Sequence, residues 1–119
     1  MNVLFKSFSV FIVLLTGLSN AASIAMEEET LHLLDYIGQS GCTFTRNGTE
    51  YSSEEARSHI LRKYNYVKSK ISTTEQVIKY AATKSSISGK AYTITCPGEE
   101  PVPSAEWLSS ELLKYRLAK

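Results

Sequence analysis

Alternating apolar and polar residues on either side of an Asn-Gly pair predict a β-hairpin. The two alternating runs cover residues 42–46 and 49–52. Asn47-Gly48 is typical of a two-residue type I′ turn, because both central residues of that turn need a positive φ. We therefore expect two short antiparallel strands joined by this turn.

A third run, residues 91–96, alternates in the same way and predicts a third strand. If it lies antiparallel beside the first strand with Cys96 opposite Cys42, then Phe44 faces Ile94. In that register every apolar residue of the two strands lies on one face and every threonine on the other. A shift by one residue would destroy this agreement, so the pattern itself predicts the register.

Helical spacing of apolar residues predicts four helices. The first covers about residues 26–39, with apolar positions one turn apart, and Gly41 can end it. The second begins with the capping box formed by Ser52 and Glu55 and runs to about residue 70.

The third helix begins near residue 73 or 74, with a second capping box at Ser72 and Glu75. The fourth follows the Pro-rich residues 101–103, and Ser104 can cap it. The order is α-β-β-α-α-β-α. We therefore expect an α+β domain, with a small three-stranded antiparallel sheet and about four helices packed on one face.

Residues 1–21 have the pattern of a signal peptide. A short positive region with Lys6 precedes an apolar run, and small residues allow cleavage after Ala21 or after Ala25. The uninterrupted apolar run is about half of the ~20 residues that a bilayer needs, which argues against a membrane anchor. We expect a single domain, residues 22–119, in the periplasm or secreted, with no membrane span after cleavage.

The charge balance argues against a nucleic-acid partner. The 119 residues carry 13 Lys and Arg against 12 Asp and Glu. Lys6 is the only charged side chain before Glu27, so the cleaved chain is neutral. Nucleic-acid binding usually needs a basic excess, and none remains in the total.

Export would place the two cysteines in an oxidising compartment, where they can form a disulfide. Small exported domains usually pair an even number of cysteines, and Cys42 with Cys96 is the only pairing available. Such a bridge closes a loop of roughly 55 residues, which is worth about 4 kcal/mol in the chain-entropy model. Two separate buried thiols are the alternative.

The motifs of common enzymes are missing, so we assign no catalytic residue, metal or cofactor. Glu55 and His59 lie one helical turn apart, but two ligands fall short of a metal site. Residues 84–90 resemble a phosphate-binding loop only superficially, because Lys84 stands in place of glycine and the following residue, Ala91, stands in place of Ser or Thr. The chain has no Gly-x-Ser-x-Gly nucleophile elbow either.

Several polar residues should gather at one end of the sheet. The predicted register places Arg46 opposite Tyr92, next to the serine-rich residues 84–90. An arginine there can bind a carboxylate or phosphate, or it can pack its stem over the tyrosine ring. The candidate ligand-binding residues are Arg46, Tyr92, Ser85, Ser86 and Ser88.

Four spaced blocks carry a family resemblance: residues 44–51, 55–59, 71–78 and 85–92. Together they resemble the YfeK-like family of small exported bacterial proteins, a domain of unknown function. Ala91 stands where that family usually has proline. The resemblance implies an envelope or periplasmic setting and brings no catalytic residues.

The resulting hypothesis is a non-enzymatic binding or interaction module of the cell envelope. Its partner would be an envelope protein or a small anionic ligand. The alternative is a small envelope enzyme or anion-binding protein that uses Arg46, His59 and the Ser85–Gly89 loop.

Overall fold

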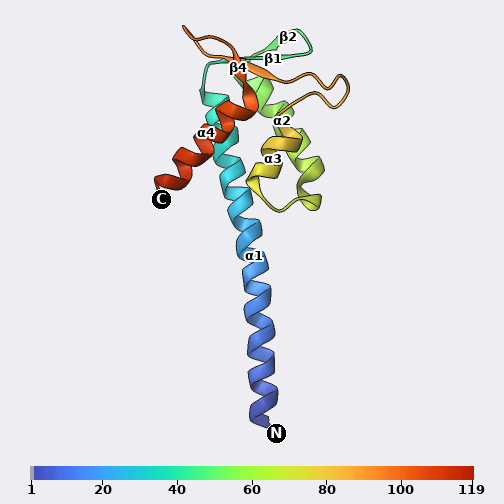
Figure 1. Cartoon of the computed structure of the whole chain (residues 1–119). Helices are drawn as coiled ribbons and strands as arrows, with labels where there is room; N and C mark the ends of the chain where they lie inside the picture. Colours follow the sequence, from blue (N-terminus) through green and yellow to red (C-terminus); the bar gives the residue numbers. More distant parts are fainter. Residues whose placement is uncertain (1) are drawn as a thin grey trace.

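Four helices and a four-stranded antiparallel sheet form the computed structural model, which describes residues 2–119 and the side chains of residues 21–119. The helices are α1 (Asn2–Gln39), α2 (Ser53–Val67), α3 (Thr74–Ala81) and α4 (Ser104–Leu117), and a 3-10 turn, η1 (Lys68–Lys70), follows α2. The strands are β1 (Thr43–Arg46), β2 (Thr49–Tyr51), β3 (Thr93–Thr95) and β4 (Val102–Pro103). Figure 1 shows the helices gathered on one side of the sheet, so the predicted α+β class is confirmed.

The predicted hairpin and register are confirmed. β1 pairs antiparallel with β2 and with β3, and Phe44 lies opposite Ile94 as expected. The hairpin turn has φ angles of 52° at Asn47 and 77° at Gly48, which is the conformation that the Asn-Gly pair predicts. The β1–β3 pairing ends at Thr45, one residue before the expected Arg46 position.

The sheet has four strands rather than three, because Val102 and Pro103 pair with Ile94 and Thr93. The strand order is β2-β1-β3-β4, so this fourth strand lies at an edge. An edge strand tolerates proline, because its outer side needs no N–H donors. Because residues 101–103 include two prolines, the sequence pattern predicted no strand there.

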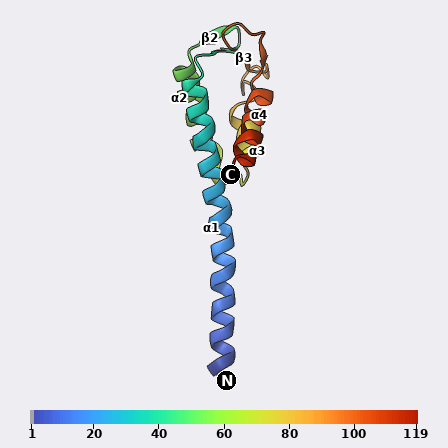
Figure 2. The same cartoon turned by 90° about the vertical axis from the view of Figure 1, so that its left-hand side faces the viewer.

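α1 begins at Asn2 and is therefore longer than the helix that we expected from about Met26. Its first half extends away from the rest of the protein (Figures 1 and 2). Residues 21–25 are exposed, and Met26 is the first buried side chain among those that the structure describes. The predicted signal peptide lies almost entirely outside the described side chains. Among residues 21–119, whose side chains the structure describes, no helix has both the length and the apolar character of a membrane span.

The capping prediction for α2 is confirmed, and two others are wrong. Ser52 and Glu55 form the expected capping box, with the Ser52 N–H donating to Glu55 at 2.9 Å. In α3 the box forms one residue later, between Thr73 and Gln76. The Ser104 hydroxyl is buried and donates to the Ala82 carbonyl at 2.6 Å, so it joins α4 to the end of α3 instead of capping α4.

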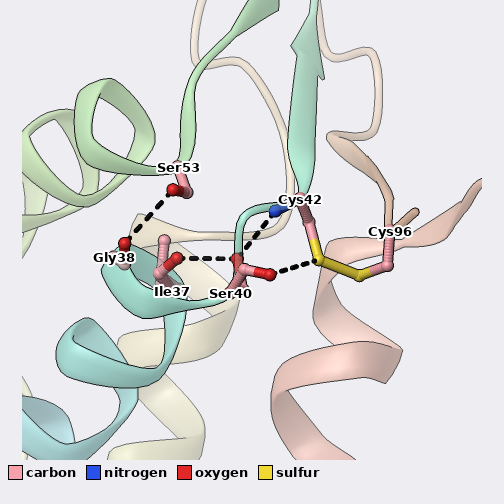
Figure 3. Close-up of a disulfide and its surroundings, with 6 residues drawn as sticks. All are labelled: Ile37, Gly38, Ser40, Cys42, Ser53 and Cys96. Carbon is pink, nitrogen blue, oxygen red and sulfur yellow. Dashed lines mark hydrogen bonds between the residues drawn. A yellow bond between two sulfur atoms is a disulfide. The ribbon is translucent and has the colours of Figure 1, made fainter.

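The predicted disulfide is confirmed and lies beside the core. Cys42 is buried and bonded to Cys96, with 4.2 Å between their Cα atoms (Figure 3). The Cys42 N–H donates to the Ser40 hydroxyl, which in turn donates to the Ile37 carbonyl. The bridge therefore fastens the end of α1 and the start of β1 to the end of β3.

The hydrophobic core lies between the helices and the inner face of the sheet. α1 supplies Leu33, Leu34 and Ile37, and the sheet supplies Phe44 and Ile94, all of them buried. The remaining core residues, most of them from the other helices, are Met26, Cys42, Ala56, Ile60, Tyr64, Val77, Ile78, Ala81, Ala82, Leu108 and Leu112. This packing fixes α2 against β1, and that contact positions the candidate site.

Candidate functional site

The serine-rich loop between α3 and β3 is held against the hairpin turn. The Asn47 side-chain amide donates to the Ser85 hydroxyl at 3.1 Å and accepts from the Ser88 hydroxyl. Ser85 is buried and also accepts from the backbone N–H groups of Ile87 and Ser88. These bonds support a structural role for both serines, and their ligand-binding role stays a prediction. Ser86 is exposed.

Tyr92 brings β3 and α2 together at the same end of the sheet. Its ring is buried, and its hydroxyl lies 3.3 Å from the Nε2 atom of His59. The same hydroxyl accepts a hydrogen bond from the Lys63 ammonium at 3.2 Å. Lys63 also donates to the Lys84 carbonyl at 3.3 Å, at the start of the loop. The hydroxyl of a buried tyrosine therefore holds a histidine and a lysine of one helix in place.

Arg46 and His59 line two adjoining hollows. The first is an apolar pocket of about 30 Å³ that Phe44 and Ile60 help to line, and it has room for about one water molecule. The second, which we call the basic groove, has a volume of about 680 Å³. The residues that line the basic groove are Arg46, His59, Arg62, Lys63, Tyr66, Val67, Tyr80 and Ser86. A groove of this size is within the usual range for small-molecule sites.

The basic groove has a positive electrostatic field. Burial lowers the pKa of His59, and the nearby charges of Arg46, Lys63 and Arg62 lower that pKa further. The Arg46 Nε atom is buried and has no hydrogen-bond partner among the described residues. None of the groove's lining residues is acidic. An anion placed there would lie among the positive charges of Arg46, Arg62 and Lys63.

Three of the five predicted binding residues line the groove or its neighbouring pocket. Arg46 and Ser86 line the groove. Tyr92 lines the pocket, and its hydroxyl already has His59 and Lys63 as partners. The hydroxyls of Ser85 and Ser88 are hydrogen-bonded to the Asn47 side chain. Among the described residues, no group of three or more His, Cys, Asp or Glu side chains could hold a metal ion.

Sequence reasoning did not single out Arg62, Lys63, Tyr66 and Tyr80. The distribution of charge contains a signal for the two cations among them and none for the tyrosines. Residues 56–97 carry eight lysines and arginines against one acidic residue, a net charge of +7. The rest of residues 22–119 carries four basic and eleven acidic residues, a net charge of −7. The neutral total therefore conceals two segments of opposite charge, which a segment-by-segment count would have detected.

The comparisons with known proteins agree with the resemblance. Residues 24–116 match the model of a family of unknown function, DUF5329. The chain belongs to this family. The match begins two residues before Met26, the first buried side chain among those described.

A curated relative comes from Salmonella typhimurium (strain LT2), where it is called uncharacterized protein YfeK. It is 38% identical over 86 residues, which cover 71% of this chain and 72% of the relative. No solved structure matches the chain. Neither the family nor this relative has a stated function. A functional proposal therefore has to rest on the residues and contacts of the basic groove.

Proposed function

We propose that this protein is an exported binding module that takes a small anionic ligand in the basic groove and does not transform it. One observation carries the proposal: Arg46, Arg62 and Lys63 line one groove around His59, with no acidic residue in its lining. Like charges at close range raise the free energy of the unliganded protein unless an anion compensates them. Such clusters are typical of sites that bind anions.

The unpartnered Nε atom of Arg46 supports the proposal. Buried polar atoms nearly always have a hydrogen-bond partner, so the unpartnered Nε atom indicates that the Arg46 guanidinium has unused hydrogen-bonding capacity. An anionic oxygen supplies the strongest acceptor for a guanidinium. The lowered pKa of His59 supports the same conclusion, because it reflects the nearby positive charges as well as burial.

The contacts of the possible nucleophiles support binding rather than catalysis. The hydroxyls of Ser85 and Ser88 are used in bonds with Asn47. The Nε2 atom of His59 faces the Tyr92 hydroxyl instead of a serine. A hydrolytic base needs its ring nitrogen within reach of a nucleophile.

A small envelope enzyme is the second candidate, because Arg46 and His59 line the same pocket. Prolonged incubation of the protein with a bound ligand distinguishes the two. Unchanged ligand spectra support the binding module. Conversion that is lost in His59→Gln would establish the enzyme.

Export is part of the proposal and has its own support. The signal-like pattern of residues 1–21 precedes a domain whose first described buried residue is Met26. The Cys42–Cys96 disulfide is typical of an oxidising compartment. To test this, the full chain would be expressed in a Gram-negative bacterium, and the periplasmic and cytoplasmic fractions would be compared by intact mass. A periplasmic product beginning at residue 22 or 26 is expected, whereas an uncleaved cytoplasmic product would overturn export.

Anion binding can be tested by titrating the purified protein with inorganic phosphate at low ionic strength while the two histidine rings are followed by NMR. We expect the His59 ring to shift in a saturable way and the His32 ring to stay unchanged. Arg62→Gln should weaken the binding. Arg57→Gln is the matched control, because it changes the same helix near Asp35 and away from the groove. Equal shifts at both histidines, or none at His59, would overturn the proposal.

A further inference from the structure

We propose that the anion of the basic groove is a phosphate monoester carried on a ring-sized organic group such as a sugar. This inference rests on the anion-binding function proposed above and names the class of ligand. Three features support it: the number of cations, the donors that they leave free, and the exposed tyrosines at the other part of the groove.

The number of cations favours a doubly charged group. Arg46, Arg62 and Lys63 contribute three positive charges to the groove lining. A phosphate monoester carries about −1.5 to −2 charges at pH 7, whereas a carboxylate carries one. A phosphate therefore compensates more of this charge than a carboxylate does.

The free donors suit phosphate oxygens. A guanidinium offers a planar fork of N–H groups that binds two oxygens of one phosphate. The Lys63 ammonium uses two of its three donors on Tyr92 and on the Lys84 carbonyl, so one remains for a ligand. These two bonds also hold the Lys63 side chain in place before a ligand arrives. The entropic cost of fixing a long side chain on binding is thereby reduced.

The carboxylates nearest the groove limit where a phosphate can lie. Glu54 and Glu55 line an adjoining hollow that also touches Arg46 and Arg62. Glu55 is held there by the Ser52 N–H in the capping box of α2. Repulsion from these two carboxylates favours a phosphate on the opposite side, next to Lys63.

The rest of the groove suits an uncharged ring. Tyr66 and Tyr80 line it and are 77% and 48% exposed, a large apolar area for a protein surface. Lys70 and Lys79 lie 5.2 Å from the centres of these rings, one on each. Rings as exposed as these offer surface for stacking against a sugar or an aromatic group. A groove of about 680 Å³ is also far larger than inorganic phosphate requires.

The first experiment compares four probes by isothermal titration at low ionic strength: glucose 6-phosphate, inorganic phosphate, glucuronate and glucose. We expect glucose 6-phosphate to bind about tenfold more tightly than inorganic phosphate or glucuronate, and glucose not to bind. If inorganic phosphate binds as tightly as glucose 6-phosphate, the ring is irrelevant and this inference fails while the anion site stands. If glucuronate binds as tightly, the preference for phosphate fails. If none of the anions binds, the proposed function fails as well.

The second experiment assigns each part of the ligand to its side chains. Arg62→Gln should weaken glucose 6-phosphate and inorganic phosphate alike, by roughly tenfold. Tyr66→Ala should weaken glucose 6-phosphate by about fivefold and leave inorganic phosphate unchanged. Tyr66→Phe keeps the ring and should keep the affinity, and Arg57→Gln is the control for charge. Equal effects of Tyr66→Ala on both phosphates would overturn the assignment of the ring.

A phosphate monoester can be a free molecule or can be displayed on a lipid, and vesicles distinguish these sources. Cosedimentation with phosphatidic acid vesicles, but not with phosphatidylglycerol vesicles, would support a lipid source if glucose 6-phosphate competes. Absence of cosedimentation would support a soluble source, given binding of glucose 6-phosphate in solution. Cosedimentation that glucose 6-phosphate does not reduce would overturn the role of the basic groove.

Discussion

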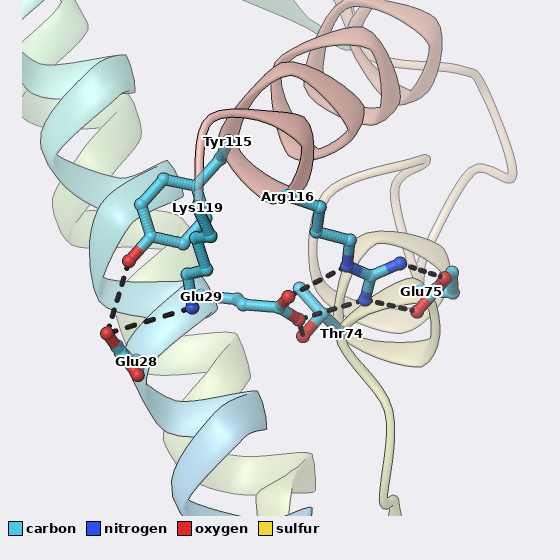
Figure 4. A network of polar contacts seen from close by, with 7 residues as sticks. All are labelled: Glu28, Glu29, Thr74, Glu75, Tyr115, Arg116 and Lys119. Carbon is cyan, nitrogen blue, oxygen red and sulfur yellow. Dashed lines mark hydrogen bonds and ion pairs between the residues drawn. The ribbon is translucent and has the colours of Figure 1, made fainter.

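Arg116, in the last turn of α4, forms a two-fold ion pair with Glu29 of α1. Its Nε atom lies 2.7 Å from Oε2 of Glu29, and its Nη2 atom lies 2.9 Å from Oε1 (Figure 4). The same guanidinium binds Glu75 of α3 at 2.7 Å, and the Thr74 hydroxyl donates to Glu29. Because Glu29 is buried, one arginine fastens three helices around a carboxylate that water barely reaches.

Loss of this arginine should destabilise the fold. Arg116→Gln leaves the buried Glu29 charge with only Thr74 as a side-chain partner. We expect the free energy of unfolding to fall by about 2 kcal/mol, less than for a fully buried pair, because the Arg116 side chain is 40% exposed. Urea unfolding at pH 7 measures the change.

Arg57→Gln is the matched control for that prediction. Arg57 pairs with Asp35 at 3.7 Å, and both side chains are more than one third exposed. Its loss should cost roughly 0.5 kcal/mol or less. Similar costs for the two variants would contradict a special role for Arg116.

The same ion pair should make stability depend on acidic pH. The Arg116 guanidinium lowers the pKa of Glu29 from its usual 4.5 to about 2. The unfolded chain therefore binds a proton at a higher pH than the folded chain, so this contribution is complete above pH 4.5 and is lost as the pH falls toward 2. Arg116 also lowers the pKa of Glu75, which adds in the same direction.

Glu29→Gln tests this dependence. The variant should be less stable than the natural chain at pH 6, and the difference should shrink at pH 3. Urea unfolding at both pH values gives the comparison. A loss of stability between pH 6 and pH 3 that is equally large in both proteins would show that Glu29 does not cause it.

The sequence predicted those parts of the fold whose signals are local. The Asn-Gly turn and the Ser52–Glu55 capping box each follow from a few neighbouring residues, and both are confirmed. The β1–β3 register joins distant strands, but the alternation within each short run and the cysteine pair predicted it, and it is confirmed as well. The errors concern choices between competing local options. Thr73 rather than Ser72 caps α3, and a strand forms where two prolines suggested only a loop.

The candidate site was predicted only in part, because it depends on distant contacts. Local pattern identified Arg46, whereas Arg62 and Lys63 become relevant only when α2 packs beside β1 and Tyr92. Ser104 and Ser85 show the opposite case, since tertiary hydrogen bonds with Ala82 and Asn47 occupy their hydroxyls. The overall composition also gave no sign of the site, because a net charge of zero conceals the basic segment of residues 56–97.

The field of the basic groove should be measurable at His59. Burial is the largest cause of its lowered pKa, followed by Arg46, Lys63 and Arg62. Arg62→Gln should therefore raise the pKa of His59 toward its usual 6.5, and Arg57→Gln should leave it unchanged. A pH titration of the His59 ring protons by NMR measures this in the natural chain and in both variants.

The lowered pKa of His59 also makes the stability of the fold depend on pH. The folded chain binds the His59 proton less readily than the unfolded chain does, so His59 reduces stability as the pH falls through 6.5. Bound phosphate stabilises the protonated ring and should raise the pKa of His59. An unchanged His59 pKa in both Arg62→Gln and the phosphate complex would contradict the positive field.

The disulfide should contribute more to stability than any single ion pair. It joins residues 54 positions apart, and closing a loop of this length in the unfolded chain is worth about 4 kcal/mol in the chain-entropy model. The double variant Cys42→Ala and Cys96→Ala should therefore lower the urea midpoint well below that of Arg116→Gln. The Ala substitution at Cys42 also removes a buried side chain. Reduction of the natural chain separates the two effects, because it opens the bridge and keeps both side chains. If the reduced protein is as stable as the oxidised one, the bridge does not restrict the unfolded chain, and the loss in the double variant is due to packing alone.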